Sequence, residues 1–156
     1  MNLLVGVDLS EATDKVVKKA EDLAKVLSAR VWLIHVTKPE PADLYSTGNE
    51  PDFIGTEVDP QLIRDSMAKR FHSEHRQIQE IADRLRKAGL DTTALLVQGA
   101  TVEAMLEEAS KLGIDMIIVG SHGRSAMYKL LVGSVSEGII HNSECPILVV
   151  PTHDRS

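Results

Sequence analysis

Short apolar runs alternate along the chain with segments in which apolar residues recur every three or four positions. The runs predict strands over 3–7, 31–36, 92–97, 114–119 and 146–150. The three-to-four spacing predicts helices over 12–28, 61–88, 101–112 and 134–141, with Gly89 and Gly113 ending two of them. Strands and helices in strict alternation are typical of an α/β protein, a parallel sheet with helices on both faces.

Ligands of such sheets bind beyond the carboxyl ends of the strands, where the winding direction reverses. Two strand orders are common for five strands. In the order 3-2-1-4-5 the first and fourth strands meet at the reversal, whereas in the order 2-1-3-4-5 the first and third do. The pattern alone leaves both orders open.

Residues 37–60 interrupt the alternation with four prolines, two glycines and no sustained period. We therefore expect a long flexible loop there. The 156 residues suit one domain spanning 1–156. Thr101 and Ser134 are predicted N-caps, and Glu137 would complete a capping box with Ser134.

Composition narrows the function classes. With 23 acidic and 17 basic residues the net charge is −6, which argues against binding to nucleic acid or anionic membranes. No apolar run approaches the ~20 residues of a membrane span, and the start lacks a basic leader region. Cys145 is the single cysteine, which is typical of a reducing compartment. We therefore expect a cytoplasmic protein without membrane insertion.

The candidate chemistry lies after the fourth predicted strand. Gly120 and Gly123 are followed, after nine intervening residues, by Gly133 and Ser134 at the start of a predicted helix. Glycine lets a phosphate approach backbone amides, and a helix start presents unpaired amides to an anion. His122 and Arg124 add donors within the loop. The same glycines could instead only turn the chain, with Ser134 only capping the helix.

The spacing Gly120-x-x-Gly123, nine residues, Gly133-Ser134 resembles the ATP-binding signature of the universal stress protein family. Residues 5–10 resemble its opening strand and the turn after it, 35–36 the end of its second strand, and 115–120 and 145–150 its last two strands, in the same order. The resemblance covers nearly the whole chain except about 38–75. It implies a Rossmann-like sheet of order 3-2-1-4-5, a homodimer, and ATP or another adenine nucleotide at the carboxyl edge.

The resemblance also implies roles for individual residues. Asp8 would lie near the ribose, the phosphates or a nucleotide-bound Mg²⁺, within a turn that includes Leu9 and Ser10. Val36 would meet the adenine through its backbone, and Gly120 the ribose. The remaining implied ligand residues are His122, Gly123, Arg124, Gly133, Ser134 and Val135.

Other nucleotide-binding and metal-binding patterns do not fit. No lysine precedes Ser134, as a Walker loop needs, and no glycines follow the first strand, as a dinucleotide site needs. His72 and His75 are interpreted as a solvated helix face. Only Asp8 and His122 could activate water, so a nucleotide-binding regulator is favoured over a slow ATPase.

The competing hypothesis is a nucleotide-independent dimeric interaction module. In the 3-2-1-4-5 order the last strand, 146–150, lies at a sheet edge, where exposed backbone invites pairing with a second copy. We therefore expect a homodimer through this strand, with an additional protein partner left open.

Overall fold

Five parallel strands form one sheet of order β3-β2-β1-β4-β5. The computed structural model describes residues 1–38, 59–122 and 132–152. The strands are β1 (Asn2–Gly6), β2 (Arg30–Thr37), β3 (Thr92–Gln98), β4 (Met116–Gly120) and β5 (Ile147–Val150). The α/β class and the 3-2-1-4-5 order expected from the sequence are both confirmed.

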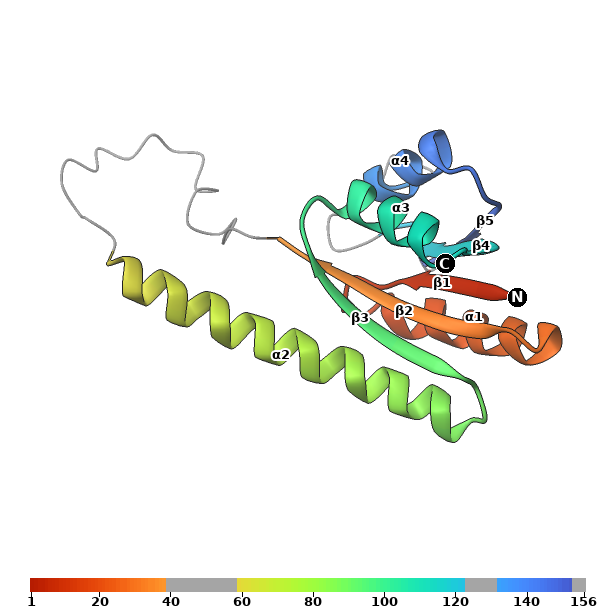
Figure 1. Ribbon diagram of the computed structural model, residues 1–156, viewed down its shortest axis with the longest axis horizontal. Helices are drawn as coiled ribbons and strands as arrows, with labels where there is room; N and C mark the ends of the chain where they lie inside the picture. The colour runs from red at the N-terminus through yellow and green to blue at the C-terminus, as the bar shows by residue number, and fades with distance from the viewer. Residues whose placement is uncertain (39–58, 123–131, 153–156) are drawn as a thin grey trace, which may run out of the picture.

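The four helices are divided between the two faces of the sheet (Figure 1). They are α1 (Thr13–Leu27), α2 (Pro60–Lys87), α3 (Thr101–Lys111) and α4 (Ser134–Asn142). Side chains alternate along β1, so Leu3 and Val5 pack towards α1 and α2 while Leu4 packs towards α3 and α4. Both faces of β1 are therefore buried, which explains its uninterrupted apolar run.

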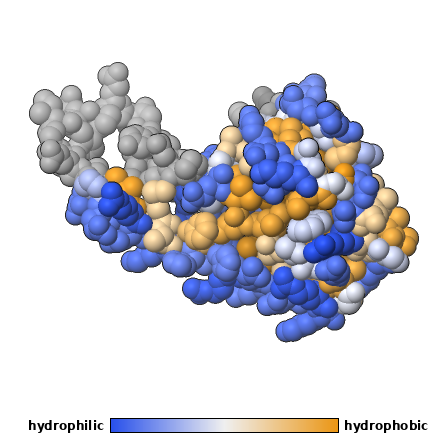
Figure 2. Space-filling view, in the orientation of Figure 1, coloured by the Kyte–Doolittle hydropathy of each residue, from blue (hydrophilic) through white to orange (hydrophobic). Residues whose placement is uncertain are grey.

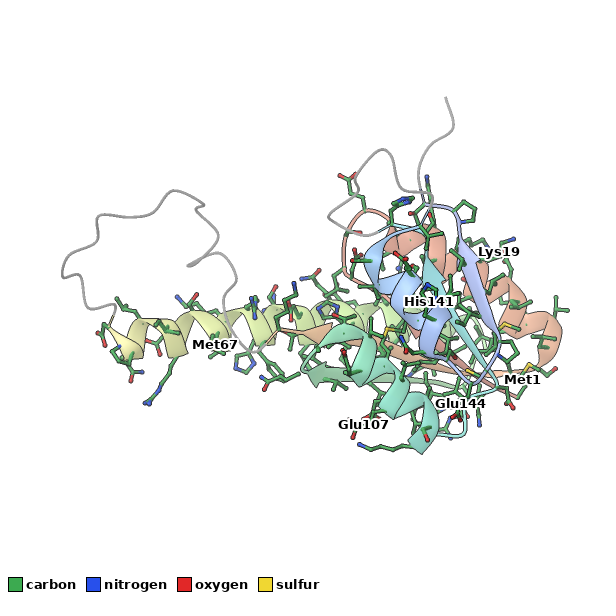
Figure 3. All side chains as sticks on the ribbon, turned by 90° about the horizontal axis from the view of Figure 1, so that it is seen from above. Met1, Lys19, Met67, Glu107, His141 and Glu144 are labelled. Atoms are coloured by element: carbon green, nitrogen blue, oxygen red, sulfur yellow. The ribbon has the colours of Figure 1, made fainter. Side chains whose placement is uncertain are left out.

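Helix α2 extends well beyond the sheet. Its 28 residues span about 42 Å, whereas the eight residues of β2 span about 26 Å. Its buried side chains, Ile78, Ile81, Ala82 and Leu85, all lie in its second half. The first half, with Met67 labelled in Figure 3, projects past the strands in both ribbon views (Figures 1 and 3).

Two predicted helix ends differ from the structure. Thr101 and Ser134 are the first helical residues of α3 and α4, and the N-caps are Ala100 and Gly133. Neither helix has a side-chain cap hydrogen bond, so the predicted capping box of Ser134 and Glu137 is wrong. By contrast, Gly89 follows the C-cap of α2 with φ +92°, as expected of a helix-ending glycine.

The surface follows the same layering. Figure 2 shows apolar side chains gathered over the strands, with hydrophilic residues over the flanking helices. The central residues of β3, an edge strand, are only half-buried, in agreement with this view. Within the described ranges, no helix has the length and hydropathy needed to cross a membrane. The 37–60 loop predicted from the sequence lies largely outside the described residues.

Candidate functional site

The carboxyl ends of β1, β2 and β4 border a pocket of about 520 Å³, a volume within the range of small-molecule sites. Strands β1 and β4 are neighbours, yet the helices that follow them, α1 and α4, pack on opposite faces of the sheet. The pocket therefore lies where the winding direction reverses, at the place where ligands of open α/β sheets bind.

Most of the predicted ligand residues line this pocket. They come from three strand ends and from the start of α4: Asp8, Val36, Gly120, His122, Gly133, Ser134 and Val135. Leu9 and Ser10 are not part of the lining. Gly123 and Arg124 lie outside the described residues. Direct contact of any of these eleven residues with a ligand stays a prediction.

Asp8 is held by the turn that follows it. Its Oδ1 accepts hydrogen bonds from the backbone N–H of Ser10 at 3.0 Å and from the Ser10 hydroxyl at 2.5 Å. Thr13 Oγ1 lies 3.5 Å from the same oxygen. The turn requires Leu9 to adopt φ +61°, a left-handed conformation that is rare for a leucine. In this structure Ser10 therefore orients the Asp8 carboxylate from outside the pocket.

The glycines bring β4 and α4 into close contact. The Gly133 N–H donates to the Ser121 carbonyl at 2.6 Å, and the Ser136 hydroxyl donates to the Gly120 carbonyl at 2.5 Å. A Cβ at Gly133 would lie 3.1 Å from the Ser121 carbonyl oxygen. The absence of a side chain at Gly133 thus lets the first turn of α4 start directly against the end of β4.

Thr152, which follows β5, connects to the same edge. Its hydroxyl accepts a hydrogen bond from the His122 N–H and donates to the His122 carbonyl, at 3.1 and 3.0 Å. Its own N–H donates to the buried Ser121 hydroxyl at 3.1 Å. Ser121 and Thr152 were not predictable from the sequence, because neither belongs to a recognisable motif.

Helix α2 contributes a polar wall that the sequence analysis also missed. Arg70 and Glu74 line the pocket together with Lys38 and His35. A signal for the first two was present: counting back in fours from the apolar Ile78 reaches Glu74 and then Arg70 on the same helix face. His35 is buried, and its Nδ1 lies 2.8 Å from the Val7 carbonyl oxygen.

The chemistry of the pocket is that of a binding site with two different ends. Amides at the start of α4 have no acceptors within their own helix, so that end favours an anion. The far end, beside β2, carries Glu74 with Lys38 and Arg70, and the Asp8 carboxylate lies after β1, the strand between the two ends. Among the described residues, no three potential metal-ligating side chains come together, so a metal would need oxygens from a ligand.

Comparison with known proteins supports this interpretation of the fold. Universal stress protein A homolog 2 of Coxiella burnetii is 30% identical over 150 residues, covering 95% of this chain and 92% of the relative. The solved structure of MJ0577 has a TM-score of 0.79 at 24% identity, covering 99% of this chain and 97% of that one.

Two further solved structures contain adenine nucleotides. A universal stress protein in complex with cAMP has a TM-score of 0.65 at 24% identity and covers 98% of each chain. The universal stress protein of Archaeoglobus fulgidus in complex with dAMP has a TM-score of 0.60 at 15% identity, covering 96% of this chain and 97% of that one. At these identities the likeness shows the shared fold.

A sequence model of the universal stress protein family matches residues 1–151, which include every strand and helix described above. The sheet order agrees with the order that the resemblance implied, and the pocket lies at the edge where the family signature begins. The chain therefore belongs to the universal stress protein family.

Proposed function

We propose that this protein is a nucleotide-binding regulator of the stress response whose pocket holds an adenine nucleotide, with ATP as the expected ligand. One observation carries the proposal. The start of α4, whose N-cap is Gly133, and the Asp8 carboxylate line the same pocket, at the point where the winding direction of the sheet reverses. The cAMP and dAMP complexes of two neighbours support the adenine nucleotide. The preference for a triphosphate rests on the glycine signature.

The start of α4 is the proposed phosphate end. Gly133 is an N-cap without a side chain, and the helix has no side-chain cap, so the amides of Ser134 and Val135 are available to a ligand. The predicted ligands Gly123 and Arg124 would extend this end. Hydrogen bonds to charged groups contribute about 1.5–3 kcal/mol each, so three or four suffice for micromolar affinity.

The β2 end is the proposed base end. Strand order places β2 two positions from β4, about 10 Å across the sheet, a separation that a nucleoside can bridge. Val36 would meet the adenine through its backbone and Gly120 the ribose. Asp8 follows β1, the strand between β2 and β4, and its carboxylate could hold the ribose or an Mg²⁺ carried by the phosphates.

The oligomeric state and the cellular compartment are part of the same proposal. The chain would act in the cytoplasm as a homodimer joined through β5, one of the two edge strands of the sheet. Nucleotide occupancy would then be communicated through this interface to a protein partner.

The test is calorimetry with ATP, ADP, AMP and cAMP, each with and without Mg²⁺. The decisive variant is Ser134→Asp, since a carboxylate at a helix start stabilises the fold yet repels phosphate. Gln61→Asp, an exposed first-turn change on α2, is the matched control. We expect Ser134→Asp to weaken ATP binding at least 10-fold and Gln61→Asp to leave it unchanged.

Absence of heat and of a thermal shift at millimolar ATP in the unmodified protein would reject the nucleotide proposal. It would favour the nucleotide-independent interaction module. Equal ATP affinity in the two variants would instead show that the phosphates do not bind at the start of α4.

A further inference from the structure

His35 connects the centre of the sheet to the ligand-binding edge. It lies on β2 and is 8% exposed, and its Nδ1 is 2.8 Å from the Val7 carbonyl oxygen. A carbonyl oxygen only accepts hydrogen bonds, so Nδ1 carries the proton and donates. Val7 immediately precedes Asp8, so this hydrogen bond holds the backbone from which the Asp8 turn begins.

The other ring nitrogen of His35 faces α2. Nε2 lies 3.5 Å from Glu74 Oε2, and this oxygen is buried without a hydrogen bond among the described residues. The ring nitrogen is the polar partner that the structure gives this buried oxygen, and a buried carboxylate that loses its polar partner destabilises the fold.

Arg70 extends the contacts to the end of β2. Its Nε lies 4.0 Å from Glu74 Oε1, and its guanidinium donates to the Lys38 carbonyl. A polar chain therefore runs from Lys38 through Arg70, Glu74 and His35 to Val7, and all five residues line the pocket.

These polar contacts lie beside the part of α2 that has no buried apolar side chains. Ile78 is the first buried residue of the helix, and Glu74 and Arg70 lie one and two turns before it. Polar contacts rather than apolar packing therefore determine where this part of α2 meets the pocket.

We propose that His35 and Glu74 are positioning residues that couple α2 to the Asp8 turn, and so set the affinity of the pocket for its ligand. The ligand part of this inference rests on the nucleotide-binding function proposed above. The coupling itself is a property of the ligand-free protein and can be measured without nucleotide.

The test compares Glu74→Gln with Glu74→Leu. A glutamine amide can donate to Nε2 of a neutral His35, so the contact survives, whereas leucine cannot replace it. We expect Glu74→Gln to keep the affinity for ATP within about threefold and Glu74→Leu to weaken it on the order of 10-fold. In the ligand-free protein, Glu74→Leu should shift the NMR amide signal of Asp8, and Glu74→Gln should leave it nearly in place.

His35→Asn provides a second route that does not depend on the folding of the leucine variant. An asparagine amide can still donate to the Val7 carbonyl but does not reach Glu74. We expect it to weaken ATP binding as much as Glu74→Leu does, and the double variant to be no weaker than either single one, as for residues acting through one contact.

Three results would overturn the coupling: unchanged ATP affinity in Glu74→Leu and His35→Asn, additive losses in the double variant, or a nitrogen NMR spectrum showing His35 Nδ1 unprotonated. If the unmodified protein binds no ATP, the proposed function fails. The His35 spectrum and the Asp8 signal then still decide the coupling.

Discussion

The hydroxyl of Ser136, in the first turn of α4, donates a 2.5 Å hydrogen bond to the carbonyl oxygen of Gly120, the last residue of β4. Ser136 is buried, so water does not replace this bond when it is removed. Together with the hydrogen bond from the Gly133 N–H to the Ser121 carbonyl, this bond aligns the start of α4 with the strand end that would hold the ribose.

Removal of this hydroxyl tests the alignment. Ser136→Ala should lower the free energy of unfolding by about 1–3 kcal/mol, because a buried carbonyl loses its partner. It should also weaken ATP binding by displacing the amides of α4. Chemical denaturation and calorimetry measure the two effects, with exposed Ser66→Ala as the control. Unchanged stability would contradict a structural role for the bond.

Gly120 leaves no room for a side chain. A Cβ at this position would lie 2.8 Å from Thr152 Cγ2 and 3.1 Å from Val16 Cγ2. Gly120→Ala should therefore destabilise the protein by about 1–3 kcal/mol, as overpacked sites do. Adding Thr152→Ser removes the nearer methyl and keeps the hydroxyl that bonds to His122, so it should restore part of the lost thermal stability. A double variant no more stable than Gly120→Ala would rule out this clash as the cause.

Asp8 can be neutralised without losing its turn. In Asp8→Asn the side-chain oxygen can still accept the two hydrogen bonds from Ser10, so the fold should persist. If Asp8 contacts Mg²⁺ on the phosphates, the gain in ATP affinity from Mg²⁺ should fall several-fold while Mg²⁺-free binding changes little. Calorimetry with and without Mg²⁺ separates the two quantities. Phosphate release followed over hours, with the same variant, tests the slow-ATPase alternative.

The outer edge of β5 can be altered selectively. The Pro146 carbonyl accepts a hydrogen bond from Ile117 of β4, and the Val150 carbonyl accepts one from Ser121, the residue after β4. Backbone groups alternate along a parallel strand, so the N–H of Val149 points away from β4. Val149→Pro should therefore abolish a β5-mediated dimer at micromolar concentration while the monomer stays folded, as light scattering and circular dichroism can show. Leu148→Pro, on the inner side, should unfold the sheet. If the dimer persists in Val149→Pro, the dimer interface does not involve β5.

The order of elements was predictable because buried parallel strands are apolar on both faces, as β1 and β4 are, and because glycines such as Gly89 end helices in a recognisable way. The strand order needed the family resemblance, since the alternation of elements is the same in either order. Capping by Ser134 could not be settled from the sequence, because Gly133 beside it is also an acceptable cap.

The missed site residues share a physical cause. Arg70 and Glu74 lie on a polar half-helix, and their place in the pocket depends on the angle at which α2 leaves the sheet. Thr152 reaches His122 across 30 positions of sequence. Contacts of this kind are set by tertiary packing, which local periodicity does not encode.

The unequal anchorage of α2 also has a mechanical consequence. Ile78 is the first buried residue of the helix, Glu74 lies one turn before it and Pro60 roughly 27 Å along the axis. If the helix tilted as a rigid body about Ile78, its tip would move between four and five times as far as Glu74. A small rearrangement beside the pocket would then become a larger displacement at the far end of α2.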